Sequence, residues 1–282
     1  MKKLVVATDS TSNLPPEIVS EYNLPVIPLK VHWGEETYID GVTLDPGTFY
    51  RWLREREDFP TTSQPSAGEF IEFFKAISEE HDTDTIVCVV ISSDLSGTYL
   101  SANQAKAALP DLNIELVDSR SVSVGLGFQA LAAAEAAREG ATLEEVLAQI
   151  HRVRARSSVL FTVDTLEYLH RGGRIGGAAR LFGTALNLKP LLTIEGGRVD
   201  VLEKNRGRRR ALQRLLQIAE ERLAGRQPSC VAVIDVDASK SADIIFDEVK
   251  ERLDPELLFR AVISPVVGGH AGPGTVGLGF YL

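Results

Sequence analysis

Short runs of apolar residues, each bounded by polar or turn-forming residues, recur along the chain and predict β-strands. The first set of these runs comprises Leu4–Ala7, Val26–Val31, Thr85–Ile91, Ile114–Val117 and Val159–Val163. A second set comprises Leu191–Ile194, Val199–Leu202, Cys230–Val236, Leu257–Ile263 and Val276–Tyr281. Because segments with helical periodicity separate many of these runs, the pattern is typical of an α/β protein.

Amphipathic spacing and capping residues mark the helices. Ser66 and Glu69 predict a capping box, and the apolar positions that follow are Phe70, Phe73, Phe74 and Ile77. Thr142 and Glu145 predict a second capping box, and the apolar positions of that helix are Leu143, Val146, Leu147 and Ile150. A further stripe stops before Gly225 and consists of Leu212, Leu215, Leu216, Ala219 and Leu223. We interpret each stripe as a face that packs into the core.

The length of 282 residues favours two domains. A helix ending at Arg156 meets the strand that contains Val159, so we predict domains at residues 1–156 and 157–282. The glycine pair within Glu195–Arg198 predicts a β-hairpin, which brings antiparallel pairing into the second domain. The expected fold is therefore α/β with two domains: a mainly parallel α/β/α N-terminal domain and a C-terminal α/β domain with a mixed sheet.

Small hydroxyl residues gather directly after the predicted strands. The runs are Thr8–Ser12, Ser92–Thr98 and Asp118–Ser121. In an open parallel sheet the carboxyl ends of the strands share one edge, and ligands bind there. Hydroxyls and free N–H groups at helix starts suit an anion such as a carboxylate or phosphate. The same residue types also cap helices, but the runs together favour a binding site.

Two other segments carry candidate binding residues. The hydroxyl cluster Thr61–Ser63 lies between Pro60 and Pro65, which predicts a stiff loop that serves as a connector or as an anion contact. Near the other end of the sequence, glycines surround His270, and such a backbone can approach a ligand closely. This setting makes His270 the best candidate among the five histidines.

The segment Leu169–Gly177 combines two arginines with four glycines. Arg171 and Arg174 on a flexible loop suit the docking of an acidic partner or a phosphate, although a connector with solvated charges has the same composition. A second basic run, Asn205–Arg210, is interpreted as the start of an exposed helix.

Composition narrows the possible partners. The net charge of −9 argues against nucleic acid or an anionic membrane as the main partner. Cys88 and Cys230 lie in apolar runs and are predicted to be small buried hydrophobes. No run approaches the roughly 18–20 apolar residues of a membrane span, and the first apolar run is too short for a signal peptide. We therefore expect a cytoplasmic protein without stable membrane insertion.

Several enzyme signatures are missing from the sequence. It contains no Walker A lysine loop, no His-Glu-x-x-His and no Gly-x-Ser-x-Gly elbow. No cluster of Cys, His and carboxylates has metal-ligand spacing, so we expect neither a metal nor a cofactor.

The combination of motifs resembles the DegV family, which includes the fatty-acid-binding B subunits of bacterial fatty acid kinase. The matching pieces span nearly the whole chain and are Thr8–Thr11, Thr62–Ser66, Ser92–Tyr99, Arg171–Ile175 and the glycine-flanked His270. The Thr-Ser-Gln-Pro and Ser-x-Leu-Ser-Gly-Thr pieces are specific when they occur together. The resemblance implies a two-domain α/β fold with a lipid tunnel between the domains.

The resemblance also implies site residues and a partner. Hydroxyls of two loops and the late histidine would hold the carboxylate of a long-chain fatty acid, and the positions here are Thr62, Ser63, Ser92, Ser93, Ser96, Gly97 and His270. Which of Ser92 and Ser93 faces the ligand is left open. The family implies handover to a separate ATP-dependent kinase, with Arg171 and Arg174 as the docking residues. No catalytic residue of its own is implied for this chain.

Simple energetics agree with a lipid ligand. Burial of about 14 to 16 methylenes at roughly 0.8 kcal/mol each contributes on the order of 12 kcal/mol, whereas each hydrogen bond to a carboxylate adds only about 1.5–3 kcal/mol. The tail is therefore expected to set the affinity and the polar end to set the orientation. With no lysine or arginine in the Thr62–Ser66 and Ser92–Tyr99 loops, His270, if protonated, is expected to be the only formal countercharge.

Two other functions are considered. An acyl hydrolase would use Ser93 or Ser96 as nucleophile and His270 as base. A sensor would bind a phosphate-bearing ligand at the same hydroxyl loops and catalyse no reaction.

Overall fold

The computed structural model describes residues 4–183 and 188–282. One sheet is entirely parallel, with strand order β2–β1–β6–β7. Its strands are β1 (Val5–Asp9), β2 (Val26–Ile27), β6 (Thr85–Val90) and β7 (Asn113–Asp118). The central strand β6 is buried along nearly its whole length, as expected of a parallel strand that helices cover on both faces.

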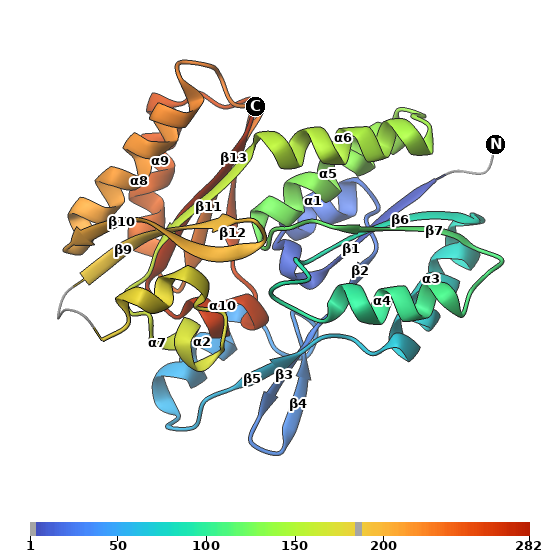
Figure 1. Ribbon diagram of the computed structural model, residues 1–282, viewed down its shortest axis with the longest axis horizontal. Helices are drawn as coiled ribbons and strands as arrows, with labels where there is room; N and C mark the ends of the chain where they lie inside the picture. The colour runs from blue at the N-terminus through green and yellow to red at the C-terminus, as the bar shows by residue number, and fades with distance from the viewer. Residues whose placement is uncertain (1–3, 184–187) are drawn as a thin grey trace.

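Helices cover both faces of the parallel sheet (Figure 1). α3 (Ala67–His81) and α4 (Thr98–Ala107) lie on one face, where Phe70 and Phe74 of α3 enter the core. α5 (Val124–Arg138) lies on the other face, and α6 (Leu143–Arg156) and α1 (Pro16–Glu21) are on the same side. The predicted capping boxes at the starts of α3 and α6 are both present.

The chain passes from α6 at Arg156 directly into β8, the first strand of a mixed sheet. The strand order is β10–β9–β8–β13–β11–β12, antiparallel except for the pair β11–β12. The strands are β8 (Ser157–Thr162), β9 (Leu188–Glu195), β10 (Arg198–Arg206), β11 (Cys230–Val236), β12 (Leu257–Val262) and β13 (Thr275–Tyr281). α8 (Arg208–Leu223) and α9 (Ser239–Arg252) cover its outer face, so the predicted α/β fold with a parallel and a mixed sheet is confirmed.

A small antiparallel sheet was not predicted. Its strands are β3 (Lys30–Trp33), β4 (Glu36–Ile39) and β5 (Thr61–Ser63), with β3 in the centre, and α2 (Pro46–Glu55) connects β4 to β5. The prediction of one strand over Val26–Val31 was wrong, because the chain leaves the parallel sheet after Ile27 and enters the small sheet at Lys30. The expected stiff loop at Thr61–Ser63 is instead the edge strand β5.

Helix α5 packs against both large sheets, and a hairpin turn of the mixed sheet contacts the parallel sheet. α5 packs against β1 and β6 on one side and against β8, β11 and β13 on the other. The turn between β9 and β10 reaches the carboxyl edge of the parallel sheet, where Ser92 Oγ donates to Gly197 O at 2.8 Å. Arg198 Nε donates to Asp94 at 2.9 Å, and Arg120 pairs with Asp94 and with the carbonyl of Gly196.

Two sequence-based expectations concern single features. Cys88 and Cys230 are free and buried, as predicted for small core hydrophobes. Among the helices of residues 4–183 and 188–282, none combines the length and apolar character needed to cross a membrane.

Candidate functional site

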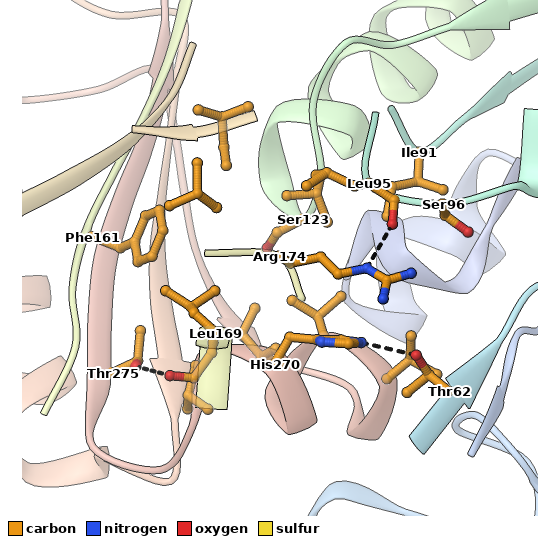
Figure 2. Close-up of a pocket in the computed structure, with 18 of the residues that line it drawn as sticks. Thr62, Ile91, Leu95, Ser96, Ser123, Phe161, Leu169, Arg174, His270 and Thr275 are labelled. Atoms are coloured by element: carbon orange, nitrogen blue, oxygen red, sulfur yellow. Dashed lines mark hydrogen bonds between the residues drawn. The ribbon is translucent and has the colours of Figure 1, made fainter. Parts of the chain in front are cut away.

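A cavity opens between the mixed sheet, the edge of the parallel sheet and the small sheet (Figure 2). Together with its open mouth it contains about 880 Å³ of space between protein atoms. Most side chains in its wall are aliphatic or aromatic, which suits an apolar ligand.

The alternation of residues along the strands of the mixed sheet builds the apolar wall. Val159 and Phe161 of β8 face the cavity, whereas Leu160 between them packs with the α8 and α9 side of the sheet. β11 repeats the pattern with Ile234 and Val236. Successive residues of a strand point to opposite faces of the sheet. One face of the mixed sheet therefore packs against α8 and α9, and the other face forms the apolar wall of the cavity.

Polar side chains gather at one end of the cavity. Thr62 of β5 and His270 of α10 (Pro265–Ala271) share a hydrogen bond of 2.8 Å between Oγ1 and Nε2. Ser63 Oγ contacts His32 at 2.7 Å, and Ser96 Oγ contacts Thr98 Oγ1 at 2.9 Å. Figure 2 shows Thr62, Ser96 and His270 on the side of the cavity opposite Phe161. Four of the residues that the sequence predicted as ligand contacts therefore line one cavity: Thr62, Ser63, Ser96 and His270.

Arg174 lies in the same cavity wall, although it was expected to dock a partner. Its Nε donates to the carbonyl of Leu95 at 2.9 Å, and Nη1 donates to the carbonyl of Gly172 at 2.7 Å. These bonds to the backbone fix the guanidinium plane, and its other N–H groups have no hydrogen-bond partner within residues 4–183 and 188–282. The expectation that His270 would be the only formal countercharge was wrong, because Arg174 brings a permanent positive charge to this end of the cavity.

Burial determines the charge state of His270. Loss of hydration, together with the nearby positive charge of Arg174, lowers the pKa of His270 to about 4. The imidazole is therefore neutral at pH 7, with one ring nitrogen protonated. Arg174, rather than His270, can neutralise an anionic group here.

The position of α10 explains how His270 reaches the cavity. The helix begins after Ser264 with Pro265 at its first position, and the backbone N–H of Val266 donates to Asp40 at 3.1 Å. Gly172, at the end of α7 (Glu167–Arg171), lies directly against the imidazole. A Cβ at this glycine would come within 2.1 Å of Nδ1 of His270, so only glycine permits this approach.

Ser92, Ser93 and Gly97 lie outside the cavity lining. Ser92 is fully buried and turned toward the β9–β10 turn, and Ser93 Oγ donates to Asp118 at 2.6 Å. Gly97 precedes α4 and packs beside the side chain of Gln64. Of the serine loop, Ser96 and its neighbour Leu95 line the cavity.

Arg171 is not part of the cavity lining. It pairs with Glu167 at 2.6 Å and lies over the ring of Phe59, with its guanidinium carbon 5.3 Å from the ring centroid. About half of its side chain is exposed, so its charge is available at the surface. Arg171, the last residue of α7, and Arg174, three positions later, therefore occupy different environments.

Sequence reasoning missed Ser123, which lines the cavity just before α5. The hydroxyl run recognised after β7 ended at Ser121, two residues before this position. The signal was present, since the serines continue past the carboxyl end of the strand. Among the described residues, no group of three or more His, Cys, Asp or Glu side chains is placed to hold a metal ion.

This fold and site define a class of α/β protein in which a parallel and a mixed sheet enclose an apolar cavity with one polar end. The family model described as "Uncharacterised protein, DegV family" matches residues 3–282. A DegV domain-containing protein of Streptomyces coelicolor is 38% identical over 279 residues, 98% of each chain. The chain therefore belongs to the DegV family.

Solved structures of the family superpose closely on this chain. A DegV family protein of Thermus thermophilus, described as fatty acid binding, has a TM-score of 0.89 at 35% identity, with 99% of each chain covered. DegV of Bacillus subtilis, described as a fatty acid binding protein, has a TM-score of 0.89 at 30% identity over 100% of both chains. A stearic acid-binding protein of Eubacterium ventriosum has a TM-score of 0.89 at 28% identity, covering 100% of this chain and 98% of that one.

Proposed function

We propose that this chain binds a long-chain fatty acid in the cavity between its two large sheets. The observation that carries the proposal is the concentration of polar groups at one end of an apolar cavity: Thr62, Ser96, Arg174 and His270. The fatty acids bound by the Thermus and Bacillus relatives support the same ligand class. The carboxylate would lie among these polar groups, and the hydrocarbon chain would extend along Phe161 and its neighbours.

The Thr62–His270 hydrogen bond suggests how neutral groups contribute. If Nε2 of the imidazole carries the proton, it donates to Thr62 Oγ1 and leaves the hydroxyl hydrogen of Thr62 free for the carboxylate. Ser96 and the free N–H groups of Arg174 add further donors. Arg174 supplies the charge that compensates the carboxylate, which otherwise would be costly to bury.

The contacts of the serines support a carrier in preference to an acyl hydrolase. A serine nucleophile needs a base within hydrogen-bond reach, but Ser93 donates to Asp118 and Ser96 pairs with Thr98. His270 Nε2 is engaged by Thr62 instead. We therefore propose that the chain itself has no catalytic residue and uses no cofactor.

The bound acid would be presented to a separate ATP-dependent kinase that phosphorylates the carboxylate. Arg171, half exposed beside the polar end, is the surface charge best placed to meet an acidic partner. Arg174 would serve the ligand rather than the partner. We further propose that residues 1–156 and 157–282 act as two domains around the ligand, and that the protein works in the cytoplasm.

The direct test is mass spectrometry of the purified protein after organic extraction, followed by titration of the delipidated protein with palmitic acid. We expect co-purified acyl chains and saturable uptake of one fatty acid per chain. Lack of both would refute the proposal. Turnover of a chromogenic acyl ester that Ser96→Ala abolishes would instead establish the hydrolase.

A further inference from the structure

Ser123 places an alcohol group in the cavity wall outside the polar end. The residue is 4% exposed and lines the cavity, and its Oγ finds no hydrogen-bond partner among the described residues. Figure 2 shows it between Arg174 and Phe161. A buried hydroxyl without a partner destabilises the protein, so an unpaired one in a ligand cavity indicates a group that the ligand supplies.

The backbone of Ser123 is also unusual for its position. The residue directly precedes α5, and its carbonyl accepts from Leu126 and Gly127 at 3.0 and 2.9 Å. Its side chain makes no capping bond, in contrast to Ser66 and Thr142, which cap their helices. The φ angle of 55° lies in a region that serines rarely adopt. Ser123 thus forgoes both the cap and a relaxed backbone conformation, and the residue lines the cavity while its Oγ is fully buried.

Other hydroxyls in the lining already have partners within the protein. Thr62 and Ser63 contact histidines, Ser96 contacts Thr98, and Thr275 donates to the carbonyl of Ala271 at 2.9 Å. Ser123 differs from these side chains, because no described residue uses either its donor or its acceptor capacity. It also stands at the N-terminus of a 15-residue helix, whose first N–H groups favour an electron-rich atom.

The surroundings of Ser123 favour a neutral oxygen over a second charge. Val122, Val159 and Phe161 line the cavity with it, and a charged group buried among them would lose its hydration without a counterion. A hydroxyl needs only one donor and one acceptor, and the serine Oγ can supply either. A hydroxyl on the hydrocarbon chain of the ligand fits these requirements.

We propose that Ser123, at the start of α5, forms a polar subsite that accepts a hydroxyl group on the acyl chain near the carboxylate. The proposal rests on the proposed binding of fatty acids and extends their class to hydroxylated long-chain acids. In the absence of the subsite, a chain hydroxyl would be buried against hydrocarbon and would weaken binding. With it, a hydroxylated acid binds at least as tightly as the plain acid.

The experiment compares palmitic acid with 2-hydroxy-, 3-hydroxy- and 16-hydroxypalmitic acid by calorimetric titration of the delipidated protein. Ser123→Ala removes the hydroxyl, and Thr275→Val is the matched control, because it removes a lining hydroxyl that already has a partner. We expect the 2- or 3-hydroxy acid to bind wild type as tightly as palmitic acid and to bind Ser123→Ala about tenfold more weakly. Palmitic acid should change less than about twofold in Ser123→Ala, which also reports correct folding.

The outcomes separate the two proposals. If neither wild type nor the two variants bind palmitic acid, the proposed function fails, and the inference fails with it. If palmitic acid binds but a proximal hydroxyl weakens binding equally in wild type and Ser123→Ala, the inference alone fails, and the serine hydroxyl serves a buried water or the backbone. Equal loss in Thr275→Val would likewise overturn the assignment to Ser123. The 16-hydroxy acid, whose alcohol is remote from the carboxylate, should not distinguish wild type from Ser123→Ala.

Discussion

Arg171 and Arg174 differ in what their guanidinium groups contact. Arg174 is held by the carbonyls of Leu95 and Gly172 in the cavity wall, whereas Arg171 pairs with Glu167 at the surface. A guanidinium that the backbone holds in one orientation loses little conformational freedom when it binds a carboxylate. The environment of each arginine, rather than its charge, separates ligand contact from surface contact.

This difference gives a paired prediction. Arg174→Gln should weaken palmitic acid binding by roughly tenfold to a hundredfold, since a hydrogen bond to a charged group contributes about 1.5–3 kcal/mol. Hexadecanol, which lacks the charge, should bind Arg174→Gln and wild type alike. Arg171→Gln is the control and should leave both affinities unchanged. Calorimetric titration measures the affinities of wild type and both variants for the two ligands. If Arg174→Gln and Arg171→Gln lose the same affinity for palmitic acid, the carboxylate lies elsewhere.

His270 should leave a signature in the pH dependence of stability. Burial lowers the pKa of His270 from 6.5 to about 4, so between these values the unfolded chain binds more protons than the folded protein. The free energy of unfolding therefore falls as the pH is lowered from about 6.5 to 4, by up to about 3 kcal/mol from this group. Burial also raises the pKa of Asp9 to about 6, so this carboxyl binds protons more readily in the folded protein. Its contribution to the free energy of unfolding rises as the pH is lowered and partly offsets the contribution of His270.

His270→Gln isolates the histidine contribution. The difference in unfolding free energy between wild type and this variant should shrink as the pH is lowered from 6.5 toward 4, because only wild type carries the titrating imidazole. Urea denaturation at several pH values measures this difference. A difference that stays constant over the whole range would mean that His270 is not desolvated.

Sequence alone located Thr62 and His270 but could not orient Arg174 or Ser123. The first two lie in motifs whose composition is distinctive, and the hydrogen bond between them joins residues 208 positions apart. For the other two, the decisive property is the direction of a side chain that leaves a turn. That direction depends on backbone angles and on carbonyls contributed by distant loops, and neither is encoded in local composition.

At the scale of elements, apolar runs predicted most strands because a buried strand needs little beyond β-branched and apolar residues. Cys230–Val236 was predicted with its observed bounds. Val26–Val31 failed because the run contains Pro28, which lacks the N–H that a central ladder requires, and the chain changes sheets there. Thr61–Ser63 failed because a short polar edge strand has no apolar signature. Its pairing with β3 depends on a distant partner.

The β9–β10 hairpin offers a matched pair of glycines for a stability test. Gly196 and Gly197 have φ angles of 55° and 86°, so alanine at either position should cost about 1–2 kcal/mol of backbone strain. Only at Gly197 would the new Cβ collide with the parallel-sheet edge, 2.4 Å from Ser92 Oγ and 2.9 Å from Arg120 Cζ. Gly196 has open space around it.

Gly197→Ala should therefore destabilise the protein by about 1–3 kcal/mol more than Gly196→Ala, since overpacking adds to the strain. Chemical denaturation of the two variants gives the comparison. Equal destabilisation would indicate that the hairpin turn does not rest against Ser92 and Arg120 in solution.

At the scale of the whole molecule, one apolar core spans both large sheets. Val6 of β1, Phe128 of α5 and Phe259 of β12 belong to the same buried cluster. The cavity interrupts this cluster, and several of its wall residues, among them Val159 and Phe161, are cluster members. A hydrocarbon chain in the cavity would therefore complete the packing between the two sheets. Ligand affinity and global stability should be coupled for this reason.

The coupling predicts how affinity depends on chain length. Each added methylene that enters the cavity contributes about 0.8 kcal/mol, so the dissociation constant should fall about fourfold per carbon in a saturated series that starts at octanoic acid. The trend should stop at the length where the tail meets the closed end of the cavity, and that length measures the cavity in solution. Thermal stability should follow the same series, because a ligand present at a hundred times its dissociation constant adds about 2.7 kcal/mol to the folded state.

Arg174→Gln serves as the internal control for this series. Removal of the charge should shift every affinity by a similar factor and leave the slope per carbon unchanged, because the tail and the carboxylate contact different parts of the cavity. If instead affinity were independent of chain length while still sensitive to Arg174, only the carboxylate would be bound, at the polar end. The hydrocarbon would then remain in solvent, and the apolar wall built by the mixed sheet would have no role in binding.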